Sequence, residues 1–179
     1  KEIEPFEYYQ QLLRLIYRFL FLMVSEERGL ISDNKLYRQY YSISRVRNLA
    51  GTAAAYNEFE DIWVNLRVTF SLFTDESTGA LLQVPPLNGD LFDPSRTETI
   101  NLLSLSNREL LHALWDLSMY REKDNAPWRR INYAALDVEE LGSVYESLLE
   151  FQPVFSESAA KHKFELLTGT ERKSTGSYY

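Results

Sequence analysis

The chain has 179 residues, of which 45% are hydrophobic and 14% aromatic, so it is long and apolar enough to bury a core as one domain. Its formal net charge of -7 argues against a generally basic nucleic-acid-binding surface, although a local basic face can exist on an acidic protein. The absence of cysteine excludes disulfides, thiolate metal sites and cysteine nucleophiles. The chain therefore does not need an oxidising compartment, and we expect it to be located in a bacterial-type cytoplasm.

The first expected helix begins at Pro5, which suits a first helical turn, and ends in the polar-then-glycine pattern of residues 26–29. Residues 12–24 are apolar nearly all round, interrupted only by Arg14 and Arg18. This stretch is shorter than the roughly 20 residues that a membrane span needs. We expect a buried helix and no membrane partner.

Residues 35–49 are the most basic segment, and their basic side chains are interleaved with tyrosines. This pattern suits phosphate contacts combined with base or sugar stacking, which makes Arg38, Arg45 and Arg47 candidate DNA contacts. The alternative is a helix whose arginines are solvated or paired with the acidic helix that follows, because charge runs are usually solvated faces. In that helix the inward residues would be Leu36, Tyr40, Ile43, Val46 and Leu49.

A third helix is expected over residues 57–73. Glu58, Glu60 and Asp61 fall in its first turn, where negative charge complements the helix dipole, so we do not predict a catalytic carboxylate pair. The apolar stripe consists of Phe59, Ile62, Trp63, Leu66, Phe70 and Phe73.

Residues 74–95 are expected to form one long Pro/Gly-rich loop that can include a short hairpin. The next helix begins at Ser106, which can form a capping box with Glu109. The polar run 121–127 then links this helix to the last one. The buried side of the helix after Ser106 is Leu110, Leu111, Leu114 and Leu117.

The last expected helix begins after Asp137, an N-cap residue that can close a capping box with Glu140. Its apolar residues are spaced as a single face, which we expect to be buried. The face consists of Val138, Leu141, Val144, Tyr145, Leu148 and Leu149.

The tail contains two further patterns, a Glu-x-Lys motif and a basic cluster. The Glu-x-Lys of residues 171–173 has the form of a restriction-nuclease motif, but that chemistry needs a β-strand frame, whereas loop and helix are expected here. Two histidines fifty residues apart, without cysteine, do not predict a metal site. A basic cluster of Lys161, Lys163, Arg172 and Lys173 can contact a DNA backbone.

The run INYAALDVEELGSVYESLLEF, followed after a spacer by FELLTGTERKSTGSYY, resembles a segment of large adenine-specific DNA methyltransferases. These enzymes belong to the type IIG restriction-modification class and its phage-defence relatives, and the segment lies just upstream of their catalytic domain. In that family a Gly-x-x-Tyr-Thr-Pro element opens the methyltransferase fold and contacts S-adenosylmethionine. The resemblance implies that Gly176, Tyr178 and Tyr179 contact this cofactor, but only together with the downstream domain.

The expected fold is all-α, an irregular bundle of about five main helices with one long loop. Residues 1–165 would form a helical connector domain, and residues 166–179 a tail leading into the methyltransferase domain. Since the chain lacks an initiator methionine and stops before Thr-Pro, we expect it to be a monomeric, non-catalytic fragment of a longer protein. Its parent would use S-adenosylmethionine and bind DNA. The alternatives are a DNA-contacting helical module, with Arg38, Arg45, Arg47, Arg172 and Lys173 as candidate contacts, and an unrelated helical protein-interaction domain.

Overall fold

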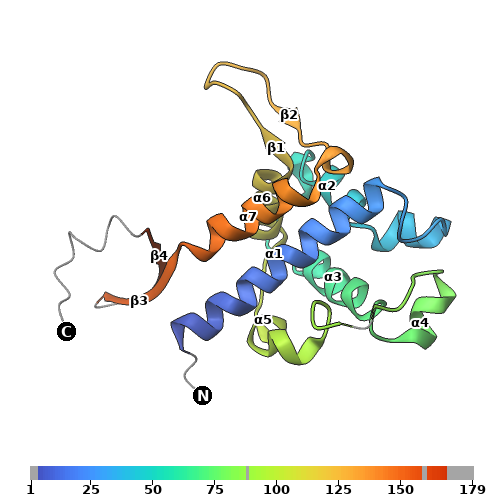
Figure 1. Ribbon diagram of the computed structural model, residues 1–179, viewed down its shortest axis with the longest axis horizontal. Helices are drawn as coiled ribbons and strands as arrows, with labels where there is room; N and C mark the ends of the chain where they lie inside the picture. The colour runs from blue at the N-terminus through green and yellow to red at the C-terminus, as the bar shows by residue number, and fades with distance from the viewer. Residues whose placement is uncertain (1–3, 88, 159–160, 169–179) are drawn as a thin grey trace.

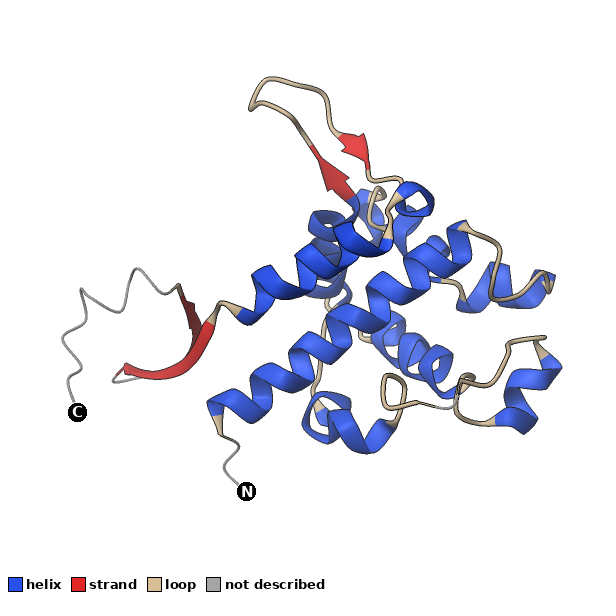
Figure 2. Cartoon of the chain, in the orientation of Figure 1, coloured by secondary structure: helices blue, strands red, loops and turns tan. Residues whose placement is uncertain are grey.

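The computed structural model describes residues 4–87, 89–158 and 161–168, and within them the chain is mostly helical (Figures 1 and 2). The helical class is therefore confirmed, but the pure all-α bundle of about five helices is wrong, because two small antiparallel sheets are present. The α-helices are α1 (Pro5–Glu27), α2 (Ile43–Leu49), α3 (Asp61–Ser71), α4 (Glu76–Leu81), α5 (Glu98–Leu102), α6 (Asn107–Ser118) and α7 (Val138–Leu149). Shorter helical segments are the π-helix η1 (Tyr37–Tyr41) and the 3-10 helices η2 (Ala53–Ala55), η3 (Pro94–Thr97) and η4 (Tyr133–Ala135). The sheets pair β1 (Met119–Tyr120) with β2 (Arg129–Arg130), and β3 (Gln152–Ser158) with β4 (Lys161–Leu167).

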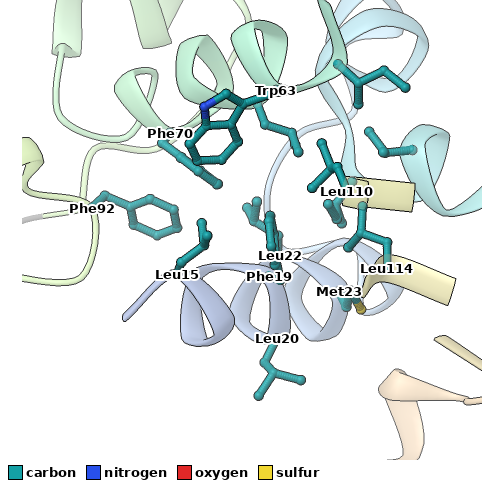
Figure 3. Packing of buried hydrophobic residues seen from close by; sticks show 14 of the residues in the cluster. Leu15, Phe19, Leu20, Leu22, Met23, Trp63, Phe70, Phe92, Leu110 and Leu114 are labelled. Atoms are coloured by element: carbon teal, nitrogen blue, oxygen red, sulfur yellow. The ribbon is translucent and has the colours of Figure 1, made fainter. Parts of the chain in front are cut away.

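Helix α1 is the central element of the fold, and it contacts α2, α5, β3, η3 and η4 (Figure 1). Pro5 occupies the first helical turn, and Gly29 ends the helix at a positive φ of 67° that glycine adopts without strain. No helix in the part of the chain that the structure describes is long and apolar enough to cross a membrane. The hydrophobic core packs around α1 and includes Leu15, Phe19, Leu22, Met23, Trp63, Phe70, Phe92, Leu110 and Leu114 (Figure 3).

The single helix expected over residues 35–49 is divided in two. Ser42 is extended, and its side chain accepts a hydrogen bond from the Arg45 N–H, so it caps α2. The preceding turn is a π-helix, whose backbone hydrogen bonds span one more residue than those of an α-helix, and this shifts the inward face. Tyr37 is buried in place of the expected Leu36 and Tyr40, which are exposed, whereas Ile43 and Val46 are buried as expected.

Helix α3 begins only at Asp61, because the residues before it bind the start of α6 instead of continuing the helix. The carbonyl oxygens of Asn57 and Phe59 accept hydrogen bonds from the first N–H groups of α6, and Phe59 is exposed rather than inward. Glu58 and Glu60 consequently precede the first turn. The remaining members of the expected stripe are buried, namely Ile62, Trp63, Leu66, Phe70 and Phe73.

The long segment of residues 74–95 is tied to α1 by Arg18, whose burial the sequence did not indicate. Its Nε donates to the Leu91 carbonyl at 2.6 Å and its Nη2 to the Asp93 carbonyl at 3.0 Å. The guanidinium also lies over the rings of Phe70 and Phe92, and burial lowers the pKa of Arg18 to about 10. The segment is not all loop, since it contains α4.

Helix α6 begins after Ser106, whose side chain accepts from the Glu109 N–H, and it buries Leu110, Leu111 and Leu114 as expected. The polar run that follows is not a link inside the bundle. It forms the end of the β1–β2 hairpin, which projects from the helical body (Figures 1 and 2).

Helix α7 begins with the expected capping box, in which Asp137 and Glu140 each accept from the other's backbone N–H. Its apolar face, however, is not buried as expected. Val144, Tyr145 and Leu149 are 41%, 45% and 50% exposed.

The segment after α7 is a β-hairpin, which corrects the expectation that residues 1–165 form an all-helical domain. Residues 171–173, for which loop and helix were expected, lie outside the described residues. Phe155 and Phe164 are directly paired across the two strands, and both rings pack against Tyr8 of α1. The proposed division after residue 165 lies within β4 and stays a prediction.

Candidate functional site

The last turn of α1 binds two distant parts of the chain through Glu26, Glu27 and Arg28, which we call the α1 clasp. Glu26 holds the start of α2: Oε1 accepts from the Tyr37 hydroxyl at 2.8 Å and the Ile43 N–H at 2.9 Å. Oε2 accepts from the N–H of Ser44 at 2.9 Å and from its hydroxyl at 2.8 Å. Both carboxylate oxygens are therefore engaged twice.

Glu27 continues the clasp by pairing with Arg47 of α2 and accepting from the Ala134 N–H at 3.1 Å. Arg47 also donates to the Ser118 hydroxyl at 3.0 Å and to the Ile131 carbonyl at 3.1 Å, and it stacks over the ring of Tyr133. Its side chain is only 1% exposed. Arg47 is consequently a buried cross-link, and its guanidinium is not open to a DNA phosphate in this structure.

Arg28 connects the clasp to the start of α7. Its Nε donates to the Ala134 carbonyl at 3.3 Å and its Nη2 to the Leu136 carbonyl at 2.5 Å. Leu136 directly precedes Asp137, the N-cap of α7. The end of α1 therefore fixes where α7 begins.

Helix α7 and the β3–β4 hairpin then return along α1 (Figure 1). The Tyr9 hydroxyl donates to the Leu148 carbonyl, and the rings of Tyr17 and Tyr145 lie 5.0 Å apart. Between the two helices is a groove of about 400 Å³, which we call the α1–α7 groove. Its lining includes Leu13, Arg14, Tyr17, Tyr145 and Leu149.

One polar atom in this groove lacks a partner. The Tyr17 hydroxyl oxygen is buried and makes no hydrogen bond with the described residues. Burial raises the pKa of Tyr17 to about 12, and the neighbouring Tyr145 and Tyr9 add to that shift. Apolar side chains around a buried, unpaired hydroxyl make the groove a place where further contacts can form.

A second concavity, of about 500 Å³, lies between the end of α1, η1 and α2, and we call it the η1–α2 pocket. It brings together Arg38 and Arg45, two of the arginines that the sequence predicted as DNA contacts, but not Arg47. Arg38 is paired with Asp33, and Arg45 donates to Asn65 at 2.8 Å.

The other predicted site residues cannot be placed. Arg172, Lys173, Gly176, Tyr178 and Tyr179 lie outside the described residues, so their predicted roles stay predictions. Lys163 is described and pairs with Glu165 at 2.8 Å.

The sequence analysis missed the β1–β2 hairpin as a candidate surface. The hairpin has four basic residues and only two acidic ones, Glu122 and Asp124; the basic residues are Arg121, Lys123, Arg129 and Arg130. Trp128 is half exposed, and the Cζ atom of Arg121 lies 4.8 Å from the centroid of its ring. The sequence feature that could have indicated this surface is the pair Arg129 and Arg130 directly after Trp128.

His112 packs edge-on against Tyr56, with 4.8 Å between ring centroids. Within the described ranges, no three His, Asp or Glu side chains are grouped so that they could hold a metal ion. No protein-family model, curated protein or solved structure matches the chain.

Proposed function

We propose that this chain is a non-catalytic helical connector of an adenine-specific DNA methyltransferase or restriction-modification enzyme, and that it positions the S-adenosylmethionine-dependent catalytic domain. In this proposal the parent protein works in the cytoplasm and supplies both the cofactor site and the DNA contacts. The supporting observation is that α7 is held along α1 by the Tyr9–Leu148 hydrogen bond and the Tyr17–Tyr145 ring contact, while its apolar side chains Val144, Tyr145 and Leu149 remain half exposed.

The α1 clasp gives α7 a defined direction, which a connector requires. Hydrogen bonds to charged groups contribute roughly 1.5–3 kcal/mol each, and the clasp provides three of them to residues 134–136, through Glu27 and Arg28. Movement at residues 134–136 would break them together. A domain attached through α7 would therefore be oriented by α1.

The exposed apolar side chains give α7 a surface for such a domain. Exposed apolar patches beside a groove mark interaction sites, and an amphipathic helix commonly binds through anchors one turn apart. Tyr145 and Leu149 are four residues apart and both line the α1–α7 groove. We assign the catalytic domain as the occupant because the methyltransferase resemblance covers this same region of the sequence.

Methyl transfer by the longer protein tests this proposal. With tritiated S-adenosylmethionine and mixed-sequence DNA, Val144→Asp and Leu149→Asp should each lower methylation at least about tenfold, the effect of losing about 1.4 kcal/mol at a docking surface. Val68→Asp is the matched control, because Val68 on α3 is equally exposed at 42% and lies on a different helix. Unchanged activity in both α7 variants, or a longer protein that transfers no methyl groups, would refute the connector role.

A second candidate function, contact with DNA, is favoured by the β1–β2 hairpin rather than by the predicted arginines of residues 35–49. A two-stranded ribbon fits the major groove, and the hairpin projects from the body (Figure 1). The Arg121–Asp124 and Arg129–Glu122 ion pairs are exposed, so each contributes little and can be exchanged for a phosphate contact.

Salt-dependent binding of the isolated chain to duplex DNA tests this second function. We expect a dissociation constant above about 10 µM at physiological salt, because the chain as a whole is acidic. Replacing Arg129 and Arg130 by glutamine should reduce the salt dependence, whereas Arg14→Gln on α1 should not. Equal salt dependence in all three proteins would remove the hairpin as a DNA contact.

A further inference from the structure

The η1–α2 pocket has the size of a small-molecule site, since such sites commonly enclose about 300–1,000 Å³ and this one holds about 500 Å³. Its wall combines charged and polar side chains with three apolar ones, Ile31, Tyr37 and Leu49. Ile31 and Tyr37 are buried in the core, so that part of the wall is held in place from behind.

The hydrogen bonds already made inside the pocket determine which groups remain for a ligand. The hydroxyls of Ser32, Ser42 and Ser44 each donate to an acceptor within the protein, namely the Leu82 carbonyl, the Arg38 carbonyl and Glu26. Glu26 is the acidic side chain of the wall, and its oxygens already accept four hydrogen bonds. The serines and the carboxylate are therefore occupied.

Among the groups left over, the two arginines and the Asn48 amide are donors, whereas Gln39 and Thr52 can both donate and accept. Arg45 makes one side-chain hydrogen bond, to Asn65, and its Nε is buried without an acceptor among the described residues. Arg38 uses Nε and Nη2, and its Nη1 has no partner among the described residues. The Asn48 side chain accepts from Arg130 through Oδ1, and its amide N–H groups have no acceptor in the part of the chain that the structure describes. A guanidinium with few acceptors is poorly satisfied when water is partly excluded.

We propose that the η1–α2 pocket binds a phosphate monoester of a small apolar molecule. The phosphate, rich in acceptors and negatively charged, would take the unused donors of Arg38, Arg45 and Asn48, because guanidinium–phosphate hydrogen bonds are among the stronger ones in proteins. The apolar body would lie against Ile31 and Leu49. This site is independent of the connector role, since it uses neither α7 nor the α1–α7 groove.

Phenyl phosphate is a suitable probe, because it joins a phosphate to a single apolar ring. In a two-dimensional amide NMR titration of the 179-residue chain, its dissociation constant should be about 1 mM, as expected of a ligand of this size. The shifted resonances should be those of the pocket wall, in η1, α2 and Thr52. Inorganic phosphate should bind at least about fivefold more weakly because it lacks the ring, and phenol and benzoate should bind more weakly still.

Three variants separate the site from general charge effects. Arg38→Gln and Arg45→Gln should each weaken phenyl phosphate binding about tenfold. Asn48→Asp should do the same, because it keeps the acceptor for Arg130 but replaces the free amide by a negative charge. Arg108→Gln is the matched control, since Arg108, like Arg38, is an exposed arginine in an ion pair, and neither it nor its partner Glu58 lines the pocket.

Because Asn48 is exposed and its hydrogen bond is retained, this variant remains decisive even if an arginine variant unfolds. Pocket resonances that stay in place at about 10 mM phenyl phosphate would overturn the proposal, as would equal binding by the Asn48→Asp and Arg108→Gln proteins. Stronger binding of benzoate than of phenyl phosphate would also overturn it, in favour of a carboxylate site.

Discussion

Arg47 and Glu27 form an ion pair in which the arginine side chain is 1% exposed and the glutamate 20% exposed. The pair joins α2 to the last turn of α1, and the same arginine reaches Ser118 at the end of α6. One side chain thereby links three helices at the point from which the chain proceeds to α7.

Arg47→Ala should lower the free energy of unfolding by about 3–5 kcal/mol, because Glu27 would be left partly buried without its cation. Urea unfolding of the variant and the parent chain measures the difference. Arg108→Ala is the control: its ion pair with Glu58 is exposed, so the loss should stay below about 1 kcal/mol. Similar losses in the two variants would show that Arg47 is not the central cross-link.

Removing the hydroxyl of Tyr37 and removing that of Tyr17 should have different effects on the stability of the fold. Tyr37→Phe should destabilise the fold by about 1–3 kcal/mol, because the buried hydroxyl donates to Glu26 at 2.8 Å. Tyr17→Phe should be neutral or stabilising by about 1 kcal/mol, since the Tyr17 hydroxyl is buried without a partner. Thermal melting of both variants gives the comparison, and a larger loss for Tyr17→Phe than for Tyr37→Phe would contradict the structure.

The sequence predicted the elements whose ends are set locally. Ser106 and Asp137 cap their helices through side-chain bonds to residues three positions away, and a short sequence contains that information. Another helix start of this kind, at Asp75, was not predicted because the surrounding prolines and glycines favoured a loop. The stripe around Trp63 and Leu66 was also predictable, since its period of 3.6 residues is the α-helical one.

Features that depend on distant parts of the chain were not predictable in this way. The π-turn before Ser42 changes the inward face by one residue, and apolar periodicity assumes a constant period. The β3–β4 hairpin is supported by Tyr8, about 150 residues earlier in the chain than the phenylalanines it contacts. The apolar pattern of α7 was recognised, but a pattern does not specify whether its partner belongs to the same chain.

The arginines of the candidate site illustrate the same limit. Arg45 and Arg47 are two residues apart, and side chains at that spacing do not share a helix face. Helical geometry therefore separates the two, although the sequence grouped both as candidate DNA contacts: Arg45 lines the η1–α2 pocket, whereas Arg47 is buried against Glu27. The sequence does not specify which of the two arginine side chains points into the core.

Titration of Tyr17 should be displaced to high pH. Its pKa is raised from 10.0 to about 12, chiefly by burial, so the folded state favours the neutral phenol. The contribution to stability is complete below pH 10 and is lost as the pH rises through about 12. In a pH titration, the difference in phenolate absorbance between the parent chain and Tyr17→Phe should have its midpoint near pH 12. Circular dichroism at each pH shows whether the chain is still folded. A midpoint near 10 would place this hydroxyl in water.

Two glycines inside helices should differ in their tolerance of alanine. A Cβ on Gly79 of α4 would lie 2.3 Å from the Leu72 carbonyl oxygen, so Gly79→Ala should destabilise the fold by at least about 1–3 kcal/mol. A Cβ on Gly142 of α7 would meet no atom within 4 Å, and Gly142→Ala should stabilise by about 0.5–1 kcal/mol through helix propensity. Chemical denaturation measures both changes. Equal effects would mean that α4 does not pack closely against the end of α3.

The connector role depends on what covers the half-exposed apolar side chains of α7, namely Val144, Tyr145 and Leu149. Hydrogen exchange read by mass spectrometry measures this directly, by comparing α7 peptides of the 179-residue chain with those of the longer protein that carries the catalytic domain. A connector predicts that α7 amides exchange at least about tenfold more slowly in the longer protein, because docking opposes local opening, while buried α6 is unchanged. Equal exchange of α7 in the two proteins would contradict the connector role.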